Sequence, residues 1–249
     1  MGWFRVWQRN VLTWKRFFKA HLVGALGEPV LYLLGLGYGL GRLVPMVQGV
    51  RYVEFIAPGL LASAIMNAAS FETTFGSFTR MKEQKTYEGI LMTPVSVAHV
   101  VAGDILFAAT KCLLDGIMIL LLMLILGLAK SPWVFLVIPT IPFTGIMFGS
   151  MGMIVTARSP SYDFFTYYFT LVISFMFIFC GVFFPITNLP EWAQGLSWFL
   201  PLTHSVNLAR ALTAGNVGAN LLADVLWIAG FATVTFCLAV QMIKRRIII

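Results

Sequence analysis

Six apolar stretches, each about as long as a membrane-crossing helix, constrain the fold of this chain more than any other feature. They lie at roughly 22–41, 55–78, 102–128, 133–157, 163–184 and 221–243. A hydrocarbon core about 30 Å thick is crossed by roughly twenty apolar helical residues. With 59% hydrophobic and only 11% charged residues, the chain cannot offer water the surface of a soluble domain. The sequence therefore predicts an all-α polytopic membrane protein with six transmembrane helices in a single domain, 1–249.

The basic residues predict how these six spans are oriented. Six spans place both termini on one side, and cytoplasmic loops carry an excess of Lys and Arg. Twelve Lys and Arg residues fall on the side of the termini, four fall on the other side, and Lys111 lies inside a span. We therefore expect both termini, and the loop at 79–98, to be cytoplasmic. This arrangement also explains the net charge of +7 without a nucleic-acid partner.

The first twenty residues predict an amphipathic helix lying on the cytoplasmic membrane surface. At about 100° per residue, Trp3, Trp7 and Trp14 fall on one face and Arg9 on the opposite face. The alternative is a cytoplasmic extension of the first span that packs on protein.

Charged residues inside the predicted spans are candidates for a transport pathway, because they are costly there and usually functional. Asp104, Lys111 and Asp115 share one helical face, and Lys111 can pair with Asp115 one turn away. They form either a polar seam facing a pathway or a self-neutralising structural cluster. Glu28, just before Pro29, marks a candidate kink.

Two further features of the spans have competing interpretations. Glu72 lies near the cytoplasmic end of the second span, where it could reach water. The fifth span is crowded with aromatic rings, including Tyr167 and Tyr168, which either line a path for amphiphilic cargo or serve packing and interface anchoring. Glycines at 35, 37, 39 and 41, and at 145 and 149, are expected to let neighbouring helices approach closely.

Sequence signatures of catalysis and metal binding are absent. The chain has no phosphate-binding loop, nucleophile elbow or zinc-protease motif, and its three cysteines and three histidines are scattered. We therefore expect no catalytic residue, no metal site and no cofactor in this chain.

The segment 185–220 is predicted to lie on the outer side. It contains two helical patterns too short to span, at roughly 191–199 and 202–214, separated by Pro201. Such short apolar segments are typical of re-entrant or interfacial helices between spans five and six. An ordered loop is the alternative.

The loop at 79–98 contains the polar stretch MKEQKTYEGILMTPVS. Tyr87, Ile90, Leu91 and Pro94 could form a small apolar knob among charges, suited to docking in a groove of another protein. A solvated loop with a positive-inside bias is the simpler interpretation.

This stretch resembles the cytoplasmic loop of type-2 ABC exporter permeases, which carries the pattern E-x-x-T-x-E-x-[IL]-L-x-T-P. The sequence departs from the family in having Gln84 and Lys85 just before Thr86. The resemblance implies that the loop couples to an ATPase through Glu83, Thr86, Tyr87, Glu88, Leu91, Thr93 and Pro94. The outer segment is similar to the family's P-x-x-x-L-P-x-W stretch and its later arginine, through Pro190, Trp192, Pro201 and Arg210.

Within this family, the runs FIAPGLLASAIMNAASFETTFGSFTRMKEQKTYEGIL and AATKCLLDG most resemble nodulation-type permeases, which export lipo-chitooligosaccharides. The resemblance implies a transmembrane subunit, in the bacterial cytoplasmic membrane, of an ATP-driven exporter of a lipid-linked glycan or similar amphiphile. Two copies of the chain, as a homodimer, would form the pathway around the first and fifth spans. Two copies of a cytosolic ATPase subunit would bind ATP and Mg.

Other functions remain open from the sequence. Polysaccharide and drug exporters are close relatives in the same family, so a drug or antibiotic efflux permease is one alternative. An ion-coupled secondary transporter or channel using the charged seam is another. A lipid-processing membrane enzyme would lack recognisable catalytic residues.

Overall fold

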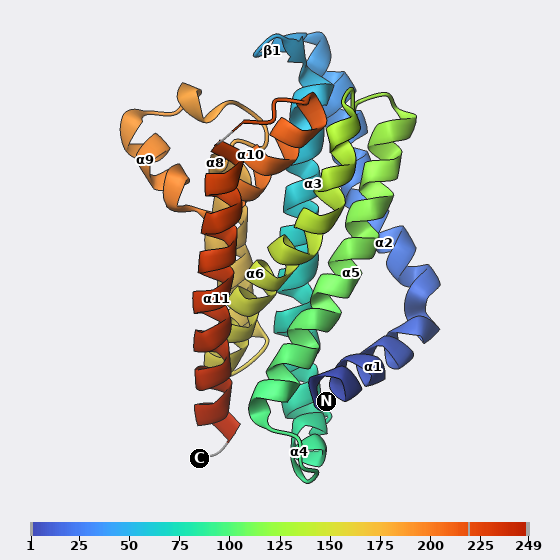
Figure 1. The fold of residues 1–249 in the computed structure, drawn as a ribbon, viewed down its shortest axis with the longest axis vertical. Coiled ribbons are helices and arrows are strands. Elements are labelled where there is room, and N and C mark those ends of the chain that lie inside the picture. Colours follow the sequence, from blue (N-terminus) through green and yellow to red (C-terminus); the bar gives the residue numbers. More distant parts are fainter. Residues whose placement is uncertain (1, 219, 248–249) are drawn as a thin grey trace.

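The computed structural model describes residues 2–218 and 220–247, which form a bundle of long helices with shorter helices at both ends (Figure 1). Several helices contain π-helical or 3₁₀ turns, marked η. In chain order the elements are α1 Gly2–Trp14, η1 Lys15–Phe17, α2 Phe18–Tyr32, η2 Leu33–Gly39, η3 Leu40–Arg42, β1 Met46–Val47, β2 Val50–Arg51, α3 Tyr52–Phe71, η4 Glu72–Gly76, η5 Thr79–Glu83, α4 Thr86–Leu91, α5 Val97–Ile125, η6 Pro132–Leu136, α6 Val137–Arg158, α7 Asp163–Tyr167, η7 Tyr168–Ile173, α8 Ser174–Phe179, η8 Ile186–Asn188, α9 Glu191–Phe199, α10 Pro201–Ala214 and α11 Asn220–Ile247.

Within the described residues, four continuous helical stretches are long and apolar enough to cross a membrane. They are Tyr52–Glu83, Val97–Ile125, Pro132–Arg158 and Asn220–Ile247. An all-α polytopic membrane protein is thereby confirmed.

The two remaining predicted spans have a different form. The stretch 22–41 is made by α2, which continues into the π-helical η2 and then η3. The stretch 163–184 is helical over Asp163–Phe179, which is shorter than the four long helices. It ends because the chain turns at Gly181, whose φ of +75° favours glycine.

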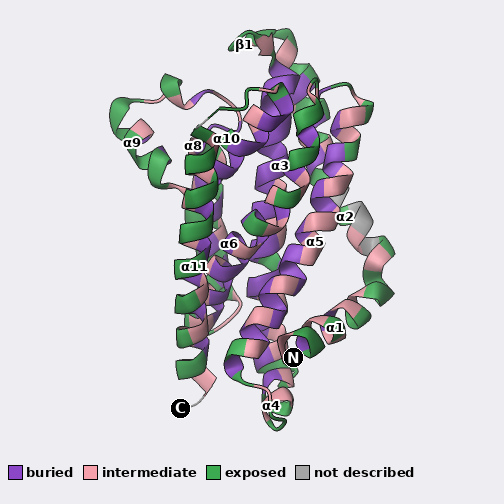
Figure 2. Cartoon of the chain, viewed as in Figure 1, coloured by how far each residue is buried: buried purple, intermediate pink, exposed green. Residues whose placement is uncertain are grey.

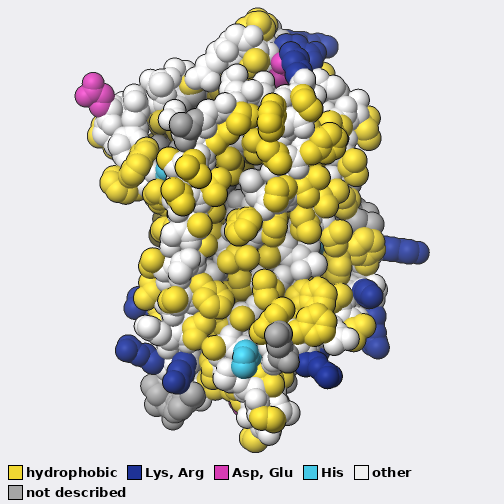
Figure 3. Space-filling view, in the orientation of Figure 1, with side chains coloured by type: hydrophobic (Ala, Val, Ile, Leu, Met, Phe, Trp, Pro, Cys, Tyr) yellow, Lys and Arg dark blue, Asp and Glu magenta, His cyan; other side chains and the backbone are white. Residues whose placement is uncertain are grey.

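The helix α3 lies at the centre of the bundle, against α5, α6 and α10. In an apolar 18-residue segment of the Tyr52–Glu83 helix, 83% of the residues are buried, compared with 17% in the corresponding segment of α11 (Figure 2). An apolar helix with so little cover is stable only in a nonpolar solvent, which is what a lipid bilayer provides. Figure 3 shows hydrophobic side chains over the middle of one face and most of its Lys and Arg side chains toward the two ends.

The expectation that glycines allow close helix packing is confirmed in α6. A Cβ added at Gly145 would lie 3.1 Å from the Ala109 Cα of α5. In the first glycine run the expectation holds only in part. Gly37 packs against Val53, whereas Gly35 and Gly39 have no other described part of the chain within 4 Å of such a Cβ.

The two ends of the bundle carry different elements. The described start of the chain, α4 and the end of α11 lie together at one end, the α4 end (Figure 1). The hairpin β1–β2 lies at the opposite end, the β1 end, and α9 and α10 lie in the same half. Both α9 and α10 are helical at the positions predicted from the sequence, so this segment is not an irregular loop.

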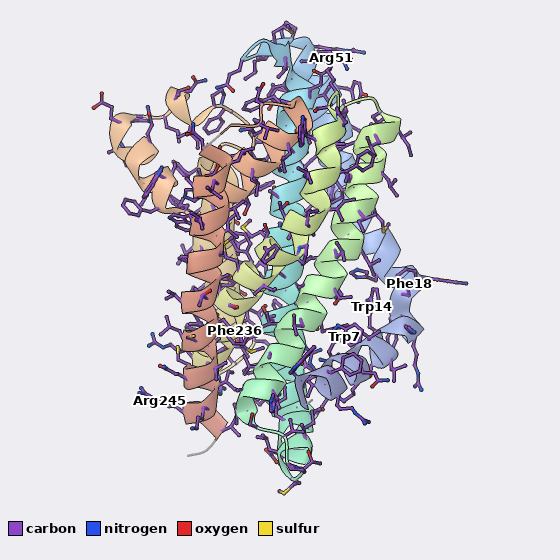
Figure 4. All side chains as sticks on the ribbon, in the orientation of Figure 1. Trp7, Trp14, Phe18, Arg51, Phe236 and Arg245 are labelled. Carbon is purple, nitrogen blue, oxygen red and sulfur yellow. The ribbon has the colours of Figure 1, made fainter. Side chains whose placement is uncertain are left out.

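The helix α1 lies against the α4 end of α5. Val6 is buried on Gly103, and Trp7 Nε1 donates to Thr110 Oγ1 at 3.0 Å. Figure 4 shows Trp7 and Trp14 on the side of α1 that faces α5. Phe4 is exposed, as are Leu12 and Phe17 farther along the segment. The segment therefore packs on protein along one side, as the alternative interpretation stated, and keeps apolar side chains free on another.

Candidate functional site: the α4 loop and the buried charges behind it

The α4 loop, residues 81–96, forms a compact projection at the end of the bundle. Lys85 adopts a left-handed conformation with φ of 51° and redirects the chain from η5 into α4. Among the predicted coupling residues, Glu83, Glu88, Thr93 and Pro94 are exposed, and Thr86 and Leu91 are half-buried.

Met92 forms the most exposed part of this projection and was not predicted. Its relative exposure is 88%, although it is an apolar residue. The sequence signal was an apolar side chain between Leu91 and the Thr-Pro pair, at the point where the short helix ends. A long, flexible thioether at this position is suited to an apolar protein groove.

Tyr87 corrects the prediction of a four-residue exposed knob. Its relative exposure is 1%, and its hydroxyl donates to Asp104 Oδ2 at 2.6 Å. Burial, with the neighbouring Asp104 carboxylate, raises the pKa of Tyr87 well above its usual value. The phenol therefore stays protonated and anchors the loop to α5.

The Asp104 carboxylate joins four parts of the fold. It is fully buried and accepts from Asn10 Nδ2 at 2.6 Å, Ser77 Oγ at 2.9 Å, Arg80 Nε at 3.1 Å and Tyr87 Oη at 2.6 Å. These donors come from α1, the end of the α3 span and α4. A buried carboxylate is stable when its acceptor sites are filled in this way.

A chain of ion pairs continues from Asp104 toward the middle of the bundle. Arg80 Nη1 contacts Glu72 Oε1 at 2.8 Å, and Lys111 Nζ contacts Glu72 Oε2 at 2.8 Å. Two cations and two carboxylates therefore form one neutral network, which we call the Asp104 network. Glu72 is buried inside it, so the expectation that this side chain reaches water was wrong.

The predicted pairing of Lys111 with Asp115 is also wrong. Asp115 Oδ1 instead lies 2.8 Å from His21 Nε2 of α2. The helical spacing on α5 permitted the pair, but α3 and α2 bring closer partners to each charge. The three predicted seam residues therefore have their partners on other helices and do not neutralise one another, so the hypothesis of a self-neutralising cluster is wrong.

A cavity of about 530 Å³ lies between α2, α3 and α5. Its walls include His21, Glu28, Asn67, Phe71, Lys111, Asp115 and Phe169. Glu28 is exposed, and α2 continues through Pro29 before it changes to a π-helix at Leu33. Tyr168 is buried with its hydroxyl 3.3 Å from Ser70 Oγ, whereas Tyr167 is exposed and does not line the cavity.

The predicted residues of the outer segment have structural contacts at the opposite end. Arg210 Nη2 donates to the Gly181 carbonyl at 2.7 Å, and its guanidinium lies 4.0 Å from the centre of the Phe55 ring. Pro201 begins α10, as suits a residue with no N–H to donate. Pro190 directly precedes α9, and Trp192 is exposed.

Comparisons with known proteins identify the family. The profile of the ABC-2 type transporter family matches residues 2–213. The chain belongs to the ABC-2 type transporter family. It is 39% identical to nodulation protein J of Sinorhizobium fredii over 247 residues, which is 99% of this chain and 94% of that protein.

Further relatives of this ABC-2 transporter support the same family assignment. Nodulation protein J of Rhizobium leguminosarum bv. viciae is 40% identical over 99% of the chain and 95% of its own length. The inner membrane transport permease YadH of Escherichia coli is 26% identical over 81% of the chain and 78% of its own length. No solved structure matches the chain. The protein is a multi-pass membrane permease of this transporter family.

Replacing Tyr87 by Phe tests the anchor beneath the loop. The change removes one donor from a buried carboxylate that keeps three others, so we expect a loss of about 1–2 kcal/mol in unfolding free energy. Thermal unfolding of the purified permease measures the loss. Tyr167→Phe removes the same hydroxyl from an exposed tyrosine, so it is the matched control and should unfold like wild type.

A second prediction concerns His204, which the sequence did not single out. Its Nδ1 lies 2.7 Å from Asp224 Oδ1, its Nε2 lies 2.8 Å from the Trp198 carbonyl, and its ring stacks on Trp227. His204→Leu leaves the Asp224 carboxylate without this partner. We expect a loss of about 1–3 kcal/mol in thermal unfolding, because a partly buried acceptor remains unsatisfied. Unchanged unfolding would show that the contact of His204 with Asp224 does not hold α10 and α11 together.

Proposed function

We propose that this permease is the membrane subunit of an ATP-driven exporter and that a separate cytosolic ATPase subunit docks on the α4 loop. The observation that carries the proposal is the exposed Met92 on a loop whose other face is anchored to a buried charge network. The exposed face offers a partner an apolar contact and the carboxylates of Glu83 and Glu88. ATP and Mg would be bound by that partner.

The proposal places the α4 end in the cytoplasm of a bacterial cell and the β1 end outside its cytoplasmic membrane. The α4 end carries both described ends of the chain and most of the predicted cytoplasmic cations. The proposal has six spans. Four are the long helices, the first span is α2 together with η2, and the fifth span is α7 together with η7 and α8. The helices α9 and α10 would then be the short re-entrant helices on the outer side.

Coupling requires that a displacement of the α4 loop reaches the membrane helices. Tyr87 of α4, Asn10 of α1 and Arg80 of η5 all bind Asp104. A rigid, fully bonded junction of this kind moves as a body, so a tilt of the docked loop would shift α1 and α5 together. This arrangement supports α1 as the second contact with the ATPase and as an interfacial helix.

We further propose a homodimer with two ATPase subunits. Leu31 and Leu34 on the first predicted span, and Tyr167 and Leu171 on the fifth, are exposed apolar or aromatic side chains. A second copy that covers these faces would enclose a pathway between them. The relatives named for nodulation, together with the mixed polar and aromatic cavity, favour a lipo-oligosaccharide or similar lipid-linked glycan as cargo.

Affinity capture from the native host tests the docking proposal. We expect the tagged wild-type permease to retain a soluble ATP-binding cassette subunit, and a variant with residues 81–96 replaced by a Gly/Ser loop to lose it. A variant with α9 replaced by a helix of equal length and polar sequence is the control, because it alters the opposite end. Wild-type protein that is captured without any ATPase, under conditions that preserve other membrane complexes, would refute the proposal.

Glu88→Ala tests the coupling role of an exposed carboxylate. Glu88 has no side-chain partner among the described residues, so its removal should leave the bundle intact. We expect at least about a fivefold loss of cargo-stimulated ATPase activity in the reconstituted complex, the effect of roughly 1 kcal/mol at a contact between the subunits. Glu191→Ala on α9 is the control, and stimulation equal to wild type in the Glu88 variant would reject this role.

The alternatives make different predictions. An antibiotic or drug efflux permease would need the same ATPase and differ only in cargo. An ion-coupled secondary transporter would move substrate as the purified chain alone, driven by an ion gradient. The neutral Asp104 network gives that mechanism little support, since each of its charges already has a partner.

A further inference from the structure

The cavity between α2, α3 and α5 has two kinds of wall. Phe71 and Phe169 approach edge to face with ring centres 6.4 Å apart and form an apolar side. Asn67 and Glu28 contribute an amide and a carboxylate. The volume of about 530 Å³ falls within the range of small-molecule sites, about 300–1,000 Å³. Such a site can hold a polar group that also has an apolar face.

The charges around this cavity leave a negative excess. Lys111 is held by Glu72 at 2.8 Å, and His21 is held by Asp115 at 2.8 Å. In the part of the chain that the structure describes, no ion pair involves Glu28. The cavity therefore presents an exposed carboxylate that no cation of the described residues pairs with.

The cavity adjoins a small recess. This recess of about 20 Å³ shares Glu28, Asn67 and two other residues with the cavity, and adds Tyr32, Leu60, Ser63 and Phe177. The added walls are mostly apolar, with two aromatic rings and one aliphatic side chain. An acyl chain joined to a headgroup in the cavity would extend along these apolar walls.

The chemistry of Glu28 determines which headgroup fits. A carboxylate and an amide oxygen accept hydrogen bonds, so they favour a headgroup rich in donors. The nonpolar face of a sugar ring can lie on Phe71 or Phe169. A phosphate or sulfate would instead face the like charge of the Glu28 carboxylate, which repels it.

We propose that this cavity binds the uncharged, hydroxyl-rich headgroup of an amphiphile and that Glu28 excludes anionic headgroups. The proposal rests on the export function proposed above and adds a specificity residue to it. Glu28 acts by accepting hydrogen bonds from the headgroup, with Asn67 beside it. The acyl chain leaves the cavity on the side where Tyr32 and Phe177 lie.

Photo-labelling of the full-length permease in nanodiscs of zwitterionic phospholipid tests the inference. Three probes share one diazirine-bearing acyl chain and differ in headgroup: an N-acyl glucosamine, an alkyl phosphate and an alkyl amine. Labelled peptides are mapped by mass spectrometry. In the wild type we expect the glucosamine probe to label the peptides that contain Asn67 and Phe169 about tenfold more than the phosphate probe, the ratio for about 1.4 kcal/mol.

Two substitutions of Glu28 distinguish an effect of its charge from an effect on folding. Glu28→Lys should invert the preference toward the phosphate probe. Glu28→Gln keeps the shape and one acceptor oxygen but removes the charge, so it should bring the two probes within about threefold of each other while the glucosamine probe still labels the site. Glu191→Lys makes the same charge change on α9 and should behave as wild type.

Several outcomes would overturn the inference. They are equal labelling by all probes in the wild type, strongest labelling by the amine, or no effect of both Glu28 substitutions. Labelling does not require the ATPase. Failure of affinity capture would therefore reject the exporter proposal alone, and Glu28→Gln should still retain the ATPase if that proposal holds.

Discussion

Replacing Asp104 by Leu is expected to lower the unfolding free energy of the permease by about 3–5 kcal/mol, as measured for other broken buried ion pairs. The change removes the common acceptor of Asn10, Ser77, Arg80 and Tyr87. It also leaves two partly buried cations, Arg80 and Lys111, facing the single carboxylate of Glu72. Thermal unfolding should show an apparent melting temperature about 10 °C or more below wild type.

Two companion variants define the cause of that loss. Asp104→Asn keeps the shape and one acceptor oxygen, so its effect should be smaller than that of Asp104→Leu. Asp163→Asn makes the same chemical change at an exposed position and should unfold like wild type. A stable Asp104→Leu variant with a bound α1 would show that the Asp104 network does not hold the α4 end together.

Replacing Gly103 by Leu is expected to detach α1 from α5 while the bundle stays folded. A Cβ at this position would lie 2.6 Å from Val6 Cβ and 2.9 Å from the Trp3 carbonyl oxygen. The second of these is backbone, so side-chain rotation cannot relieve the overlap. Amide hydrogen exchange across Gly2–Trp14 should become at least about fivefold faster, the effect of losing 1–3 kcal/mol of packing.

The matched control is Gly230→Leu in α11. A Cβ there has no other described part of the chain within 4 Å, so the added side chain extends outward. Exchange in α1 should be unchanged in this variant. If Gly103→Leu exchanges like wild type as well, the close approach of α1 and α5 is not needed to hold the helix.

Much of the local structure could be predicted from the sequence because hydrophobic length and turn residues determine it. A run of apolar residues such as 102–128 must bury its backbone groups in a helix, and α5 occupies most of that run. The short helices α9 and α10 followed from Pro201 and from apolar patterns too short to span. The amphipathic pattern of the first residues likewise predicted the helix α1.

The partners of the charged side chains were decided by the tertiary structure. Helical spacing placed Lys111 near Asp115, but the packing of α3 and α2 brought Glu72 to the first and His21 to the second. Tyr87 could be read as an exposed knob because nothing local indicated that α4 rests on Asp104. Local sequence specifies which groups can bond, and the approach of helices distant in sequence selects among them. Burial then makes that selection strong, because an unpaired charge in the buried part of the bundle has no water to solvate it.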